Sequence, residues 1–161
     1  MKSWSDFSAE QPELAEHGRK MLLRSRERVG LAFIATLRKD GAPRLHPISL
    51  ILSQGHAYVI IPRASPKCAD LLRDGRYALQ ASPPPNNEES EEFYFSGCAA
   101  QIHDPIVQQM LMDDTGITVE ENELLFELFP ERAMYTKLLN RGAPDEHPIH
   151  YKWRASSVSQ V

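Results

Sequence analysis

The sequence of 161 residues predicts a mainly β protein with short α-helices, built as a small antiparallel β-barrel. Three observations lead to this fold class. Short runs of apolar and β-branched residues recur along the chain, tight-turn signals join the first three runs, and helical spacing is confined to a few segments. A hydrophobic fraction of 42% and a charged fraction of 25% are ordinary for a globular protein with one core.

The first predicted element is a helix over residues 12–26, because Leu14, Ala15, Gly18 and Leu22 recur at helical spacing. Proline is tolerated in the first turn of a helix. Arginines are favourable at the C-terminal end, because their positive charge interacts well with the negative end of the helix dipole.

A three-strand meander follows, because the apolar period changes to two. The Asp40-Gly41 pair is a strong hairpin signal, and Gln54-Gly55 predicts a second tight turn. The predicted strands are residues 29–38, 44–53 and 56–62.

Ser65 is expected to cap a short helix, with Pro66 at its first position and Gly75 just past its end. Two more strands are then expected, over residues 76–82 and over residues 93–102.

The second of these strands carries Gly97, a plausible bulge. Asp104 predicts the cap of another short helix. Residues 122–140 fit a helix or a strand from pattern alone, with Pro130 dividing them, and residues 147–155 alternate like a strand.

The charges are unevenly distributed, although the formal net charge is only -4. Residues 77–131 hold 12 acidic residues and no Lys or Arg, whereas the 29 residues between Asp40 and Asp70 hold no carboxylate. A pI of about 5.9 argues against a nucleic-acid partner. The carboxylate-free window instead suits one small anion.

No apolar run approaches the ~18 residues of a membrane span, and the first residues lack the apolar core of a signal peptide. We therefore expect a cytoplasmic protein without a membrane partner. Cys68 and Cys98 have no neighbours at metal-ligand spacing, so we expect free thiols and no metal site. His147 and His150 are interpreted as surface residues.

The strongest local feature is PRASPKCADLL, where a strand ends and a helix begins with Ser65 and Lys67 in its first turn. Unpaired N–H groups, a hydroxyl and an ammonium are groups that hold phosphate. A capped surface helix with a solvated lysine is the alternative. Arg44 strengthens the phosphate interpretation, because its strand neighbours the one ending at Pro62 and antiparallel strands lie only ~4.8 Å apart.

The sequence also resembles the flavin-binding split-barrel family related to pyridoxamine phosphate oxidase. The resemblance lies in the order of GLAFIATLRKDGAPRLHPISLIL, AYVIIPRASPKCADLLRDGRYALQA, FYFSGCAAQI and the Trp153-Arg154 tail, with Gly30 to Ala81 the most specific stretch. It implies a six-stranded antiparallel split β-barrel that forms a homodimer with FMN at the interface. The implied layout is one domain over 1–161, with a leading helix in 1–27, the main barrel strands in 28–103, and a helix plus closing strands in 104–161.

By this resemblance, Arg44, Ser65 and Lys67 would bind the FMN phosphate, and Trp153 would approach the flavin from the partner chain. The strand from Arg44 to Ser49 would run along the ring system, with residues of the next strand close by. The implied cofactor-binding set is Arg44, His46, Pro47, Ile48, Ser49, Ile60, Ile61, Arg63, Ser65, Pro66, Lys67 and Trp153.

The activity implied is a flavin-dependent oxidoreductase that moves hydride or electrons between FMN and a reduced nicotinamide or small organic substrate. The C-terminal arginine and histidine of the vitamin-pathway oxidase have no counterpart in YKWRASSVSQV, which argues against that reaction. A deazaflavin-dependent reductase using Arg63 and Arg73, and a non-catalytic flavin or haem carrier or sensor, remain alternatives. No residue is singled out as a catalytic acid or base.

Overall fold

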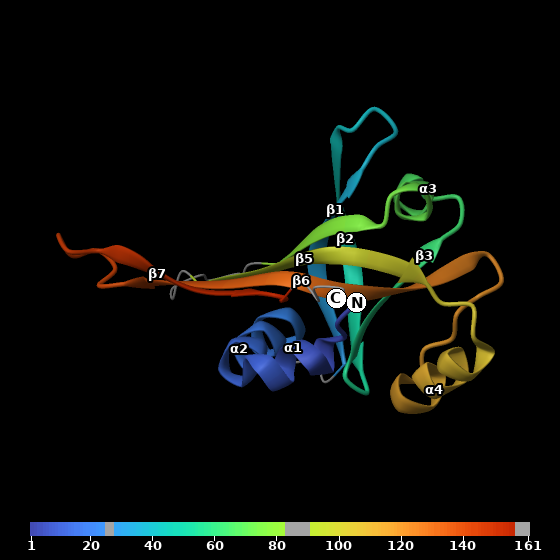
Figure 1. The fold of residues 1–161 in the computed structure, drawn as a ribbon, viewed down its shortest axis with the longest axis horizontal. Helices are drawn as coiled ribbons and strands as arrows, with labels where there is room; N and C mark the ends of the chain where they lie inside the picture. Colours follow the sequence, from blue (N-terminus) through green and yellow to red (C-terminus); the bar gives the residue numbers. More distant parts are fainter. Residues whose placement is uncertain (25–27, 83–90, 157–161) are drawn as a thin grey trace, which may run out of the picture.

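The computed structural model describes residues 1–24, 28–82 and 91–156. In chain order the elements are α1 (Trp4–Glu10), α2 (Pro12–Leu23), β1 (Val29–Leu37), β2 (Pro43–Ser53), β3 (His56–Pro62), α3 (Pro66–Arg73), β4 (Arg76–Ala81), β5 (Glu91–Gln101), α4 (Pro105–Thr115), β6 (Glu123–Leu139) and β7 (His147–Arg154) (Figure 1). The predicted strands agree with the observed ones to within two residues at each end.

The strands form a closed antiparallel barrel, which confirms the predicted fold class. Their order is β3-β2-β1-β4-β5-β6-β7, and β3 also pairs with β6, so β1 to β6 close the barrel. The seventh strand pairs with β6 outside this closure. Together, β6 and β7 extend to one side of the barrel as a long arm (Figure 1).

The segment that sequence pattern left open is the strand β6, 17 residues long. Leu124, Phe126 and Leu128 point into the barrel core, while Leu125 belongs to a second apolar cluster outside it. Burial on both faces gives a continuous apolar run, which does not reveal its period. The register of β5 and β6 shifts at Gly97, so the expected bulge is confirmed.

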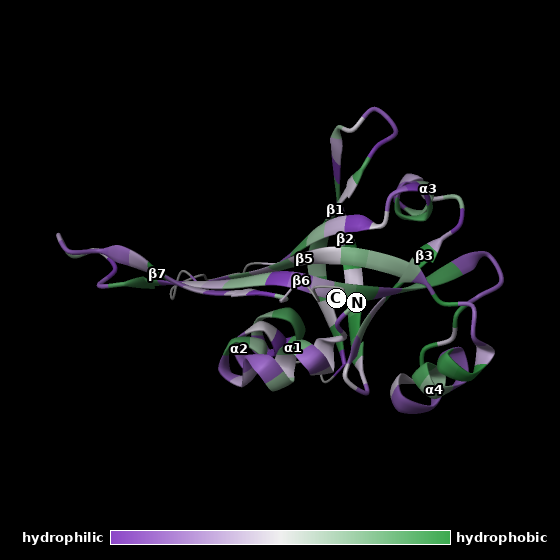
Figure 2. Ribbon diagram, viewed as in Figure 1, coloured by the Kyte–Doolittle hydropathy of each residue, from purple (hydrophilic) through white to green (hydrophobic). Residues whose placement is uncertain are grey.

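Helices α1 and α2 cover one side of the core beneath β5 and β6. Trp4 and Phe7 of α1 pack with Phe93 and Phe95, and Leu14 and Leu22 of α2 are among the other residues buried there. Figure 2 shows hydrophilic residues on the side of α2 that faces away from the strands.

The shortness of α1 hid it from the apolar pattern, although Ser3 and Asp6 form a capping box at its start. Helix α2 ends at Leu23, and the last two residues of the predicted helix lie outside the described residues. No helix in the described ranges is long and apolar enough to cross a membrane. Both cysteines are free, with Cys68 buried and Cys98 half-buried.

Candidate functional site

Strand β2 separates from β3 halfway along its length. The two strands pair only from Leu50–Val59 to Ser53–His56, after which β3 pairs with β6. From Pro43 to Ser49, β2 therefore has a strand partner only on its β1 side among the described residues. The expectation that Arg44 lies beside Pro62 on a neighbouring strand is wrong, because the sheet splits there and the β1–β2 hairpin projects away (Figure 1).

Arg44 is instead connected to the predicted phosphate segment through helix α3, by contacts with Asp70. The carboxylate of Asp70 accepts hydrogen bonds from Arg44 Nε at 2.7 Å, from Thr36 Oγ1 at 3.0 Å and from an Arg73 nitrogen at 3.1 Å. Asp70 is only 3% exposed. In space, the surroundings of Arg44 thus contain one carboxylate, that of Asp70. This is contrary to the expectation, drawn from the charge distribution, of a region without carboxylates.

The charge state of Asp70 follows from two opposing effects. Burial raises its pKa, but hydrogen bonds from Arg44, Thr36 and Arg73 outweigh burial and hold the pKa below its ordinary value. Asp70 is therefore ionised at neutral pH. Two arginines face this one carboxylate, so the surroundings of Asp70 keep a net positive charge.

His46 lies on the same face of β2 as Arg44, two residues further along. Its Nε2 atom is buried and has no hydrogen-bond partner in the described part of the chain. Burial lowers the pKa of His46, and the positive charges of Lys67 and Arg44 lower it further. The ring is therefore neutral at pH 7, with one buried nitrogen left for a partner that the chain does not supply.

Ser65 and Lys67 remain available for an anion at the start of α3. Ser65 is the N-cap residue, yet its side chain makes no cap hydrogen bond, and Pro66 occupies the first helical position. Lys67 is half-buried and forms no ion pair with a described residue. We call Arg44, His46, Ser65, Lys67 and Asp70 the α3 cluster.

Several residues of the predicted set lie elsewhere. Arg63 is exposed, and its Nε donates to the Glu121 carbonyl at 3.1 Å. The side chains of Ile48 and Ile61 are buried in the barrel core, and Ile60 packs into the apolar cluster beneath α4. Alternation along a strand explains this, since neighbouring side chains point to opposite faces.

Trp153 is part of the core of its own chain. Its ring centre lies 4.7 Å from that of Phe7, and its indole N–H donates to Glu10 at 2.9 Å. The indole is therefore enclosed beneath α1, and the suggestion that it reaches a flavin in the partner chain has no support from this position.

The outer side of the β1–β2 hairpin is apolar. Phe33 pairs with Pro47, and Leu31 and Leu45 lie at alternate positions on the same two strands, so these side chains share one face. Leu45 is 67% exposed, and Leu31 and Phe33 are exposed as well. Together with Ser49, also exposed, this apolar face (Leu31, Phe33, Leu45 and Pro47) adjoins the unpaired edge of β2.

Sequence reasoning missed Asp70 and Thr36, which hold Arg44 in place. A usable signal was present, because Arg73 follows Asp70 by three residues on a predicted helix, a spacing that favours an ion pair. The sequence could not show that the inner face of this helix lies over Thr36 and Arg44.

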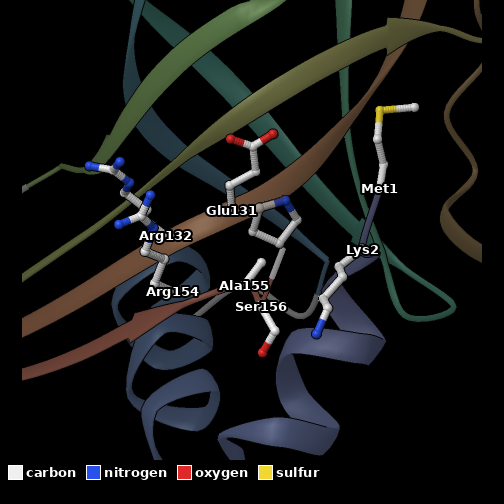
Figure 3. A pocket seen from close by; sticks show the side chains of 8 residues that line it. Met1, Lys2, Glu131, Arg132, Arg154, Ala155 and Ser156 are labelled. Carbon is white, nitrogen blue, oxygen red and sulfur yellow. The ribbon is translucent and has the colours of Figure 1, made fainter. Parts of the chain in front are cut away.

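A large cavity lies at another place. It has a volume of about 910 Å³ and lies where the start of the chain meets β6 and the end of β7. Figure 3 shows Arg132 and Arg154, which are partners in the β6–β7 ladder, side by side at its edge. No residue of the predicted cofactor set lines it.

The two histidines near the tip of the arm are exposed, as expected. His147 Nδ1 contacts the Asp145 carbonyl at 2.8 Å, and His150 Nδ1 contacts Thr136 Oγ1 at 2.9 Å. Across the described ranges, no group of three or more His, Cys, Asp or Glu side chains is placed to hold a metal ion.

No family model and no curated protein matches the sequence. Solved structures share the fold. PhzG from Burkholderia lata 383, in complex with tetrahydrophenazine-1-carboxylic acid, has a TM-score of 0.62 at 11% identity over 94% of this chain and 86% of its own. An F420 reductase has a TM-score of 0.53 at 14% identity over 71% of this chain and 93% of its own.

A heme binding protein from Mycobacterium smegmatis has a TM-score of 0.58 at 12% identity and covers 81% of this chain. The chain spans only 56% of that protein's length. At these identities the likeness establishes the split-barrel fold, which is shared by proteins named for haem, F420 and phenazine chemistry.

Proposed function

We propose that the protein is an FMN-binding flavoprotein oxidoreductase that acts as a homodimer. The observation that carries this proposal is the α3 cluster, in which the Lys67 ammonium, the Ser65 hydroxyl and a buried nitrogen of His46 form no side-chain hydrogen bond or ion pair with the described residues. The cluster adjoins an unpaired strand edge, and an exposed apolar face lies on the opposite side of the same hairpin.

The phosphate of FMN fits the α3 cluster by charge and by geometry. Lys67 offers its ammonium and its backbone N–H to a dianion, and the Ser65 hydroxyl adds a neutral donor, whereas the Cys68 N–H already donates to the Ser65 carbonyl at 2.9 Å. Arg44 is fixed through its Nε by Asp70, which leaves its terminal nitrogens for the ligand. An anion would also relieve the unfavourable position of a lysine at the positive end of a helix.

The ring system of FMN has a hydrogen-bonding edge and two apolar faces. Between Pro43 and Ser49 the backbone of β2 has free groups on the side away from β1, and the apolar face lies next to them. The chain would bind and orient the ring there, using Ser49 and the strand edge. When bound, FMN supplies hydride and electron transfer with a reduced nicotinamide or a small organic substrate.

A second copy of the chain is the proposed cover for the apolar face. Leu31, Phe33 and Leu45 are exposed on adjacent strands, and contiguous apolar patches of this kind mark interaction surfaces. An isologous contact through this face would bring two copies of the α3 cluster to one interface and exclude water from both rings.

The longer, more anionic tail of a deazaflavin would need further free cations beyond the phosphate. Arg73 is occupied by Asp70 and by the Leu37 carbonyl, and Arg63 is turned to the Glu121 carbonyl. These contacts favour FMN over a deazaflavin. Haem is ranked below both, because the histidine nitrogen at the site is buried among cations.

The test is the absorption spectrum and mass of the small molecule that copurifies, followed by titration of the emptied protein with FMN, a deazaflavin and haem. We expect a flavin spectrum and FMN binding that quenches flavin fluorescence. A colourless protein whose addition leaves FMN fluorescence unchanged would overturn the proposal. Reduction of the bound flavin by NADH or NADPH distinguishes an oxidoreductase from a carrier.

A further inference from the structure

A second pocket lies at the opposite end of β2 from the α3 cluster. It has a volume of about 150 Å³ and is enclosed between α4 and the strands β2, β3 and β6. Arg44 and Ser53 are nine residues apart on β2, so the two sites are separated by about 30 Å along the strand. Val107, Met110 and Leu111 of α4 form its apolar wall.

The polar side of the α4 pocket is a histidine–carboxylate pair. His56 Nδ1 lies 2.6 Å from Glu127 Oε1, and Glu127 is only 6% exposed. Glu127 sits opposite Tyr58 in the β3–β6 ladder, which fixes the carboxylate beneath His56. Since Nδ1 is occupied by the carboxylate, His56 Nε2 is the ring nitrogen left for another group.

The charges around the α4 pocket are predominantly negative. Glu127 is the one formally charged side chain among the described residues that line it, with histidine taken as neutral. Above it, Asp114 of α4 accepts from Ser53 Oγ at 2.6 Å and pairs with Arg28 at 3.1 Å, so that cation is already balanced. The charge of Glu127 is therefore opposed only by a partly exposed imidazole.

The pocket also offers ring surface to a cation. The rings of His56 and Tyr58 stack with centres 5.8 Å apart, and Tyr58 lines the pocket. Burial, together with the nearby charge of Glu127, raises the pKa of Tyr58 to about 12. The phenol consequently stays neutral, which preserves the electron-rich ring face that attracts cations.

We propose that the α4 pocket binds a small primary amine in its ammonium form. The ammonium would be held by the Glu127 carboxylate and the lone pair of His56 Nε2, and the apolar body would lie against Val107 and Met110. A cavity of about 150 Å³ accommodates a molecule roughly the size of benzene. This proposal is independent of the cofactor at the α3 cluster.

The charge of the ligand follows from the cost of burying Glu127. A buried carboxylate is expensive unless a full positive charge or several donors compensate it. The imidazole of His56 supplies a single hydrogen bond to this carboxylate, whereas an ammonium supplies a charge and three donors. An anionic ligand would meet Glu127 and Asp114 without a free cation in the described pocket lining.

Calorimetric and NMR titrations of the full chain with benzylamine, benzyl alcohol and benzoate test the proposal, since these probes share one ring and differ in charge. We expect benzylamine to bind about tenfold or more tightly than benzyl alcohol, because the alcohol lacks the charge-assisted contact. Benzoate should not bind. The ring resonances of His56 should move with benzylamine.

Two pairs of variants locate the effect. Glu127→Gln keeps the shape of the side chain and should weaken the binding of benzylamine about tenfold while leaving the binding of benzyl alcohol unchanged. The control is Glu131→Gln, at an exposed position of the same strand, which should change neither affinity. Val107→Phe should fill the pocket, and Met112→Phe, on α4 but outside the pocket, should not affect binding. Thermal unfolding confirms that each variant is folded.

Three results would overturn the proposal. They are equal affinities for benzylamine and benzyl alcohol, benzylamine binding that survives Glu127→Gln, and absence of binding across primary amines from ethylamine to benzylamine.

Discussion

Each end of the barrel buries one carboxylate, and the two are surrounded differently. Asp70 at the α3 end accepts from two arginines and a threonine, whereas Glu127 at the α4 end has His56 as its one side-chain partner within the described ranges. Lys67 adds a further cation near the first carboxylate, whereas the charge of Asp114 near the second is balanced by Arg28. Similar burial of similar groups therefore leaves one end suited to an anion and the other to a cation.

The substitution Asp70→Asn is the strongest test of this difference between the two ends of the barrel. Two arginines would then lose their only buried counter-charge, so we expect unfolding free energy to fall by about 3 kcal/mol. Chemical denaturation measures this change in the free energy of unfolding. Asp113→Asn, exposed on α4, should stay within about 0.5 kcal/mol of wild type, and Glu127→Gln should cost only about 1 kcal/mol because His56 can still donate to the amide. Equal losses for Asp70→Asn and Glu127→Gln would contradict the difference drawn between the two ends.

Lys67→Ala tests whether the positive end receives a phosphate. Loss of one charge-assisted contact should weaken FMN by about 1.5–3 kcal/mol and leave riboflavin, which has no phosphate, unchanged. Fluorescence titration with FMN and with riboflavin measures the two affinities. Lys39→Ala, exposed next to the hairpin turn, is the control and should change neither affinity. Equal weakening of both flavins would remove Lys67 from a role at the phosphate.

The barrel could be predicted from the sequence because its strands alternate or are bounded by turn residues, as at Asp40-Gly41 and Gln54-Gly55. The arrangement of the α3 cluster was predicted only in part. Arg44 and Lys67 do lie near one another, since both act on His46, but Asp70 and α3 bring them together. Sequence periodicity shows which face a residue occupies on its own element and does not show which elements meet. Trp153 illustrates the same limit, because nothing in its neighbourhood reveals that α1 covers it.

Leu45→Ala tests whether the apolar face is an interface. Removing an apolar side chain from an interface should weaken self-association by about 1.5 kcal/mol, or roughly tenfold in the dissociation constant. Ile106→Ala on α4 is a matched control, because both side chains are 67% exposed. Sedimentation velocity over a range of concentrations measures both variants. An unchanged dimer in Leu45→Ala, or a monomeric wild type, would show that this face has another role.

The smallest expected effect is the pH dependence that Asp70 adds to stability. Its pKa in the folded chain is held below the ordinary value of 3.8, so its contribution to stability is fully present above that pH and is lost as the pH falls toward the folded pKa. The difference in unfolding free energy between wild type and Asp70→Asn should therefore be constant from pH 5 to pH 7, within about 0.5 kcal/mol, and should narrow near pH 3. Urea unfolding at a series of pH values measures it. A difference that does not narrow in acid would mean that Asp70 stabilises α3 through its shape and hydrogen bonds alone, and the contrast with Glu127 would then be one of packing instead of charge.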